Sequence, residues 1–364
     1  MRVLSTSLLA LVATTATLAA QTDVFVPAIT AIEEGNDLSD TRMFSRDAFR
    51  AQQIVASSYL APTSADLTAI AYRIDNDNSS GSVATTFDNV TVDLSATSVD
   101  PGSMSTTFAN NITGATTQVF SGSVSVPAYA STPGGIGPFF AIPLAQSFTL
   151  TTANGNLLID ITANGGGSSV QVTLDGSLPG GTARFIGTTG PTSQFSRLDL
   201  LVAGNGSQGR FSGLIPDESF VLFAQSQVQY SGAMLLGATE IAPTFSLSGQ
   251  GMPGNFLYHI PSVATPFTMT FSPIGGWRAV FNLNIPDDPL VVFATLWAQA
   301  VVVDPPANPR GLVLTRAQKI TFGEELPHPL NQVSSSDPAA TSGFARYTGG
   351  IPGGAVLRVS GTFQ

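Results

Sequence analysis

Short apolar runs alternate with turn clusters from about residue 65 to the end of the chain, as in "DLTAIAYRID", "VATTFDNVTVDLSAT" and "TQVFSGSVSVP". Within "DNVTVDL", Val90, Val92 and Leu94 fall on one face of an extended strand, and the polar residues between them fall on the other. Strands at this spacing, without a helical period, predict an all-β chain of β-sandwich or jelly-roll type. One face of this strand is expected in the core and the other in water.

A shift in composition divides the chain at "DGSLPGGTARFIGTTGPTS", residues 175–193, after which strands resume with "RLDLLVAGN". We therefore expect two β-sandwich (jelly-roll-like) domains, over residues 21–182 and 183–324, after an N-terminal signal peptide. Residues 325–364 are expected to form a C-terminal extension with "AVLRVSGTF" as a final strand. The sequence leaves open which of the two domains this strand joins.

Residues 39–60, "SDTRMFSRDAFRAQQIVASSYL", depart from the β pattern. Ser39 or Asp40 could cap a helix, and Arg42, Arg46 and Arg50 recur at a spacing of four that would line one helix face. The alternative is an irregular segment that leads into a strand at "AQQIVASSYL".

Residues 290–322, "LVVFATLWAQAVVVDPPANPRGLVLTRAQKITF", are the most apolar part of the chain after the N-terminus. The run up to Val303 is shorter than the ~20 residues of a membrane helix and is rich in β-branched side chains. The prolines of "DPPANPRG" prevent continued pairing, so we predict a hairpin. Its even-numbered face, from Leu290 to Val302, is expected in the core, and its odd-numbered face, which carries Trp297 and Gln299, is expected to be partly covered by the first domain, the C-terminal segment or a ligand.

The first 20 residues place one Arg ahead of a short apolar stretch that closes on small residues, which is typical of a secretory signal peptide. We therefore expect a secreted protein, extracellular or at the cell surface, with the periplasm as an alternative and no transmembrane span after signal cleavage. The chain has no cysteine, so stability must come from packing and sheet hydrogen bonds, and thiol chemistry is excluded.

Only 10% of the residues are charged, and the formal net charge is −10. Lys319 is the only lysine, and the chain has no basic run. Nucleic acid is therefore not an expected partner.

The order of features in the first half, from "TAIAYRIDNDN" through "VTVDLSATS" and "TQVFSGSVSVP" to "NLLIDI", resembles a group of uncharacterised secreted β-sandwich proteins of planctomycete bacteria. The second half, with "ATLWAQAVVVDPPANPRGLVLTRAQKITFG", resembles a domain found in similar proteins. The resemblance implies an exported bacterial β-sandwich protein. It implies no activity, because none is established for the group.

Candidate catalytic groups are few. The two histidines, His259 and His328, stand far apart beside prolines, and no G-x-S-x-G motif accompanies them. Carboxylates occur as doublets, but adjacent residues on a strand point to opposite faces and make poor acid and base pairs; the doublets are Glu33 with Glu34, Asp217 with Glu218, Asp287 with Asp288, and Glu324 with Glu325. We therefore expect no catalytic residues and no enzymatic activity.

The loop "DNDNSSG" places Asp75, Asp77 and Ser79 at alternating positions, as in calcium-binding loops. The EF-hand pattern is incomplete, because Ser80 and Thr86 replace its Gly and its bidentate Glu. A polar hairpin turn is the alternative. Calcium is the one cofactor that the sequence suggests.

Aromatic side chains could form a sugar-binding platform on an exposed sheet face, with Trp277, Trp297, Tyr230 and Tyr258 as the candidates. The leading interpretation is an exported non-catalytic β-sandwich protein, a structural or adhesive component of the cell surface or extracellular matrix. The alternatives are a glycan-binding module and, behind it, a secreted hydrolase that uses two carboxylates. The expected partners are polysaccharide or other cell-surface proteins.

Overall fold

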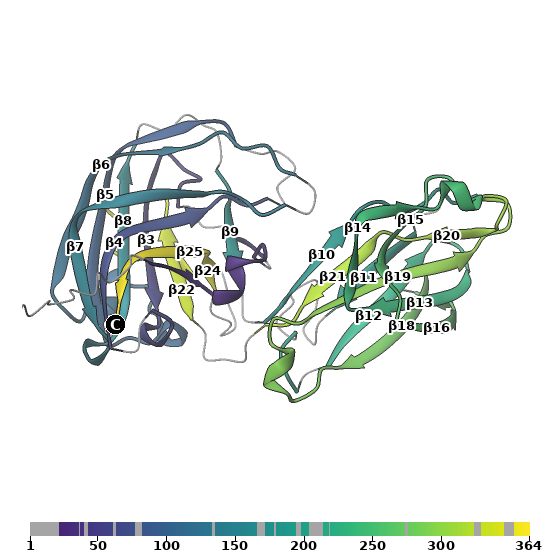
Figure 1. Cartoon of the computed structure of the whole chain (residues 1–364). Helices are drawn as coiled ribbons and strands as arrows, with labels where there is room; N and C mark the ends of the chain where they lie inside the picture. Colours follow the sequence, from purple (N-terminus) through teal and green to yellow (C-terminus); the bar gives the residue numbers. More distant parts are fainter. Residues whose placement is uncertain are drawn as a thin grey trace, which may run out of the picture.

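The computed structural model describes residues 22–35, 37–39, 43–60, 63–76, 82–132, 135–165, 172–177, 180–193, 198–203, 214–217, 219–273, 276–323, 329–345 and 353–364. The predicted fold class is confirmed: the described chain is almost entirely β-structure, in several sheets of sandwich type. Figure 1 shows the strands gathered into two units.

The N-terminal unit is built from three sheets, and all three contain strands from both ends of the chain. In each sheet of the unit the paired strands are antiparallel. The first has the order β1 (Thr22–Val26), β25 (Leu357–Phe363), β4 (Ser64–Arg73), β7 (Phe139–Thr151). The second has the order β23 (Phe344–Ala345), β22 (Leu330–Ser335), β3 (Ala48–Val55), β8 (Asn156–Asn164), β5 (Thr85–Thr97), β6 (Thr116–Val126). The third has the order β2 (Asp37–Ser39), β9 (Leu174–Ser177), β24 (Gly354–Ala355).

The C-terminal residues therefore complete the N-terminal unit. β25 lies between β1 and β4, and β22 pairs with β3. The sequence predicted an extension with one final strand and left open which domain that strand joins, whereas the described residues of this region contain four strands, β22 to β25. Strand pairing of this kind between distant segments leaves little trace in the local sequence, because it depends on which edges meet in space.

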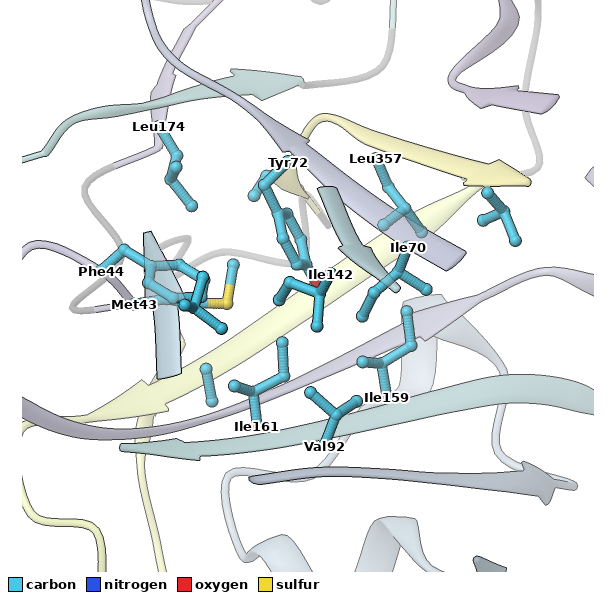
Figure 2. Packing of buried hydrophobic residues seen from close by; sticks show 14 of the residues in the cluster. Met43, Phe44, Ile70, Tyr72, Val92, Ile142, Ile159, Ile161, Leu174 and Leu357 are labelled. Atoms are coloured by element: carbon cyan, nitrogen blue, oxygen red, sulfur yellow. The ribbon is translucent and has the colours of Figure 1, made fainter. Parts of the chain in front are cut away.

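The core of the N-terminal unit lies between its two larger sheets. Ile70, Ile142 and Leu357 of the first sheet lie over Val92, Ile159 and Ile161 of the second (Figure 2). The predicted alternation in "DNVTVDL" is confirmed, since Val90, Val92 and Leu94 are fully buried and the residues between them are not. Each such burial stabilises the fold by about 1.5–3 kcal/mol relative to exposure.

Residues 43–60 form no α-helix, and residues 40–42 lie outside the described residues. Met43 to Asp47 make a turn, β3 follows, and the three-residue 3-10 helix η2 (Ser57–Tyr59) ends the segment. The helical spacing of the arginines is overridden because the side chains of this segment enter the core: Met43, Phe44 and Phe49 are buried, and Arg50 pairs with Asp160 of β8. The irregular segment leading into a strand was the better interpretation.

The second unit is inserted between β9 and β22 of the first. Its larger sheet has the order β10 (Thr182–Ile186), β21 (Ala317–Thr321), β19 (Thr295–Val303), β13 (Ser231–Gly237), β16 (Val263–Thr268), with β20 (Leu312–Leu314) also on β19. The other sheet has the order β11 (Leu198–Ala203), β12 (Ser219–Ser226), β18 (Gly276–Asn284), β17 (Thr270–Ser272). The separate hairpin β14 (Thr239–Ser246) and β15 (Phe256–Ile260) completes the unit.

The hairpin predicted for residues 290–322 is confirmed. β19 pairs with both β20 and β21, with Val301 opposite Leu314 and Thr295 opposite Thr321. The even-numbered face is core only from Ala298 onward, because the strand begins at Thr295 and Leu290, in the short 3-10 helix η7 (Pro289–Val291), is 85% exposed.

The odd-numbered face of β19 is covered by β15 of the same unit. Trp297 packs with Tyr258, and the Gln299 amide donates to the Phe256 carbonyl at 2.8 Å and to the Thr315 carbonyl at 2.7 Å. The sequence suggested that the first domain, the C-terminal segment or a ligand covers this face. For Trp297 and Gln299 all three suggestions were wrong. The β14–β15 hairpin, whose partner the sequence did not reveal, lies there instead.

Two connections join the units, and glycines allow them to lie against each other. A Cβ on Gly323 would come within 2.2 Å of the Gly180 carbonyl oxygen, and one on Gly181 within 2.1 Å of the Thr321 carbonyl oxygen. Only glycine permits such a close approach of two backbones.

Candidate functional site

Three carboxylates from distant segments meet inside the N-terminal unit. Glu34 follows the 3-10 helix η1 (Ala28–Ala31), Asp75 comes two residues after the end of β4, and Asp175 lies in β9. One ligand oxygen of each lies within 4.8 Å of those of the other two, and all three residues are buried. We call Glu34, Asp75 and Asp175 the acidic triad.

Backbone pairing fixes this meeting. Ile74 forms a bridge with Leu174, and the Asp75 amide donates to the Thr173 carbonyl at 2.9 Å. The end of β4 is thereby held against the start of β9, which brings Asp75 and Asp175 to neighbouring positions. The side chain of Glu34 then approaches from η1.

Arg73 is the basic member of this group and is fully buried. Its Nε donates to Asp175 Oδ2 at 2.6 Å, and its Nη2 forms an ion pair with the same oxygen. Its Nη1 donates to the Thr30 carbonyl at 2.6 Å, and the nearer Glu34 oxygen is 3.9 Å from its Nε. The Arg73 guanidinium, which lies at the end of β4, therefore binds both η1 and β9.

Backbone amides hold Glu34 from both sides. Its Oε1 accepts from the Asn76 amide and its Oε2 from the Gly137 amide, each at 2.8 Å. Gly137 is required, because a Cβ there would come within 1.7 Å of the Ile74 carbonyl oxygen. Hydrogen bonds of this kind fix the orientation of the carboxylate.

Asp175 differs from Glu34 in having one oxygen without a donor. Its Oδ2 accepts from Arg73 and from the Gly35 amide, at 2.9 Å, whereas its Oδ1 is buried and has no hydrogen-bond partner among the described residues. Burial raises the pKa of Asp175 to about 8; Arg73 opposes this shift, and the Glu34 carboxylate adds to it. An oxygen in this position can take a proton or a metal ion.

Glu33, the neighbour of Glu34, faces the second unit. Its carboxylate pairs with Lys319 of β21 and Arg184 of β10, the latter at 3.6 Å, and accepts from the Thr321 hydroxyl at 3.3 Å. Arg184 also donates to the Gly135 carbonyl of the first unit. The two residues of the doublet therefore have different partners: Glu34 lies inside the first unit, and Glu33 lies at the junction of the two units.

The sequence-derived calcium candidates are only partly placed by the structure. Asp75 belongs to the acidic triad, whereas Asp77 and Ser79 lie outside the described residues. Glu34 and Asp175 were not among the metal candidates, because they are distant in sequence from Asp75. The Glu33–Glu34 doublet was a weak signal, because it is one of four acidic doublets in the chain.

Of the aromatic platform candidates, three are buried. Trp297 packs in the core with Tyr258, whose hydroxyl accepts from the Thr188 amide at 2.9 Å. Tyr230 is buried with its hydroxyl 3.4 Å from Asp304 Oδ2. Trp277 is half-buried and lies edge-on to Phe271 at 5.6 Å between ring centroids. The four rings therefore do not share an exposed face.

A second pair of carboxylates lies on the face of the larger N-terminal sheet that is turned away from the core. Asp93 and Asp160 are direct partners across β5 and β8, and burial, followed by the Asp160 charge, raises the pKa of Asp93 while Arg50 lowers it. Asp160 accepts from Arg50 and from Gln52, both at 2.7 Å. This pairing organises a polar network over the sheet.

Of the two histidines, only His259 lies within the described residues. His259 is buried in β15, and burial lowers its pKa to about 4, with the Leu235 backbone acting in the opposite direction. His328 lies outside the described residues, as do Glu218, Glu324 and Glu325. Asp288 caps a turn by accepting from the Leu290 amide at 2.9 Å, which fits the turn expected at that doublet.

No protein-family model, no curated protein and no solved structure matches the chain. Within the described residues, no helix has the length and apolar character needed to cross a membrane. The geometry of the chain itself therefore has to support any proposal about function.

Proposed function

We propose that this protein is an exported, non-catalytic β-sandwich protein that serves as a structural or adhesive component of the cell surface or extracellular matrix. The observation that carries the proposal is that Glu33 and Glu34 bind fixed partners within the protein. Both carboxylates are buried and bound by fixed partners, one within the N-terminal unit and one at the junction. Charges used in this way join segments of a scaffold, whereas catalytic carboxylates face a substrate across a cleft.

His259 and the Asp93–Asp160 pair also lack the exposure of a catalytic group that faces a substrate. His259 is buried, and the Asp93–Asp160 pair is bound by Arg50, which itself donates to the Ala340 carbonyl at 3.2 Å. The N-terminal sequence supports export, and the absence of cysteine leaves stability to packing and to these polar ties.

Location is tested on intact cells of the source organism with an antibody to the full chain. We expect added protease to degrade the protein before lysis, or the protein to appear in the medium. A cytoplasmic reference protein must stay intact in the same sample. Full protection until lysis would contradict export.

Catalysis is tested by incubating the purified chain with a panel of polysaccharides and measuring new reducing ends. We expect none above the buffer control. Reducing ends that the wild-type chain releases and the Asp93→Asn variant does not would overturn the proposal, because they would assign acid or base chemistry to the facing carboxylate pair.

Glycan binding is the second candidate, favoured by the Phe271–Trp277 pair at the β17–β18 edge. Phe271 is 64% exposed and leaves its ring available beside Trp277. If this pair binds sugar, the Phe271→Ser variant will lose affinity for a polysaccharide that the wild type retains on a glycan array. The Phe344→Ser variant, in an exposed position of the other unit, is the matched control.

A further inference from the structure

We propose that Glu34, Asp75 and Asp175 form a binding site for a calcium ion inside the N-terminal unit. Two oxygens that bind one Ca²⁺, each at roughly 2.3–2.6 Å, cannot be much more than twice that distance apart. One oxygen of each triad member lies within 4.8 Å of the other two. The three carboxylates therefore already stand at separations that a single ion can bridge.

The second observation is the state of Asp175. This residue is fully buried, and its Oδ1 has no hydrogen-bond partner within the described chain, although its other oxygen accepts from Arg73 and Gly35. A buried carboxylate oxygen without a donor is costly, because it has lost its bonds to water. A cation among the triad oxygens would supply the missing interaction.

The charges of the described residues point the same way. Arg73 supplies one positive charge against three carboxylates, and the nearby Arg184 and Lys319 are paired with Glu33 instead. Arg73 is the basic side chain that pairs with both Glu34 and Asp175, so these two carboxylates alone exceed it by one negative charge when both are ionised. A cation among the triad oxygens would offset that excess.

The donor set selects the kind of ion. All three donors are carboxylate oxygens, without histidine or thiolate, which favours Ca²⁺ or Mg²⁺ over Zn²⁺ or copper. Mg²⁺ retains several of its waters in most protein sites, whereas Ca²⁺ accepts a shell made largely of protein oxygens. Full burial of Glu34 and Asp175 therefore favours Ca²⁺.

An ion here would join segments that the sheets connect only in part. It would connect the residues after η1, the end of β4 and β9, and its Glu34 ligand adjoins the Glu33 that contacts the second unit. Calcium would then stabilise the N-terminal unit and hold the junction in place. This inference stands independently of the proposed export and of the absence of catalysis.

The test uses the full chain, freed of metal with EDTA and titrated with CaCl₂ by calorimetry, with MgCl₂ in a parallel titration. We expect one calcium per chain, weaker binding of magnesium and a rise in Tm on adding calcium, since a ligand of the folded state stabilises it. The Asp75→Asn and Glu34→Gln variants each remove one charge and should weaken calcium binding by ~10-fold or more. Asp88→Asn, an exposed carboxylate of β5, is the matched control.

Three outcomes would overturn the proposal. One is that the wild-type chain binds no calcium and shows no change in Tm, which would leave the triad with a proton in place of a metal ion. Another is that both triad variants bind calcium as tightly as the wild type. The third is that only Asp77→Asn removes binding, which would place the ion in the loop suggested by the sequence. Circular dichroism of each variant shows whether it is folded, and the wild-type titration decides the question if neither variant folds.

Discussion

The two units organise their interiors differently. Among the described residues, the N-terminal unit has a single continuous apolar core, and this unit holds eleven of the twelve largest fully buried side chains, Phe220 being the exception. The described core of the inserted unit is divided into three smaller clusters, and this unit carries eight of the twelve large apolar side chains that are exposed in the described chain. The first unit is therefore expected to dominate the stability of the protein, and the second to offer more apolar surface for contacts.

In the inserted unit, polar side chains form hydrogen bonds that join segments of the chain. Gln299 bridges β15 and the residue after β20, and the Gln318 amide donates to the Leu200 carbonyl at 2.9 Å. Asp304 accepts from the Ser193 amide at 2.7 Å. Because such bonds contribute about 1 kcal/mol each, against about 1.5–3 kcal/mol for a buried Leu or Phe, the smaller cores are less strongly held.

The largest expected effect comes from Phe44→Ala in the N-terminal core. Phe44 lies edge-on to Phe49, Phe87 and Phe140, with ring centroids 5.1–5.2 Å apart. Removing its ring should lower the free energy of unfolding by about 3–5 kcal/mol, because the surrounding rings cannot close the cavity.

The distribution of tryptophan makes this measurement selective. Trp277 and Trp297 are the only two tryptophans, and both lie in the inserted unit. In urea titrations of Phe44→Ala, far-UV circular dichroism should show an early transition that tryptophan fluorescence does not. If the fluorescence transition moves to lower urea by the same amount, the two units unfold together. The difference between their cores would then not appear as a difference in stability. Phe344→Ala, an exposed ring of β23, should shift neither signal.

The same contrast explains what the sequence could and could not predict. Alternation over "DNVTVDL" and the prolines after Val303 act locally, so the sandwich strands and the 290–322 hairpin were predictable. The arginine spacing of residues 42–50 was also a local signal, but the burial of Phe44 and Phe49 outweighed it. A local pattern predicted the structure correctly where the side chains that it assigns to the core are the ones that are buried.

The acidic triad lay beyond that kind of inference. Its members are separated by 41 and 100 positions in the chain, and two of them are brought together by the backbone pairing of Ile74 and Asp75 with Leu174 and Thr173. Of the three members, only Asp75 was predicted as a metal ligand, together with Asp77 and Ser79 of the same loop. Likewise, the cover over Trp297 depends on where the β14–β15 hairpin folds back, which no repeat in its own sequence encodes.

The second prediction uses pH to weaken the inserted unit alone. Burial lowers the pKa of His259 to about 4, below the ordinary value of 6.5, so the folded state resists protonation. Above pH 6.5 the histidine is neutral in both states and its full contribution is present. As the pH falls from 6.5 to about 4, the unfolded chain takes up a proton that the folded chain does not, and stability decreases by on the order of 3 kcal/mol.

Fluorescence-detected urea titrations between pH 7 and pH 4 measure this loss. His259→Gln should have a flatter pH profile across that range, whatever its own stability at pH 7, because carboxylate titration is common to both proteins. Equal slopes for the two proteins would assign the acid sensitivity to other groups. The circular dichroism transition of the N-terminal unit serves as the internal reference.

The smallest effect is expected at the junction between the units. Glu33→Gln removes the charge that pairs with Lys319 and Arg184. Lys319 is 25% exposed and can return to water, so the loss should be about 1 kcal/mol and should affect the coupling of the two units more than either core. The circular dichroism and fluorescence transitions should move apart, and limited proteolysis should cut faster at the connections near Gly180 and Gly323. Glu240→Gln, on the exposed strand β14, should leave both readouts unchanged. If Glu33→Gln also leaves the two transitions in place, Glu33 does not couple the units, and their separate cores account for the stability of each without help from the other.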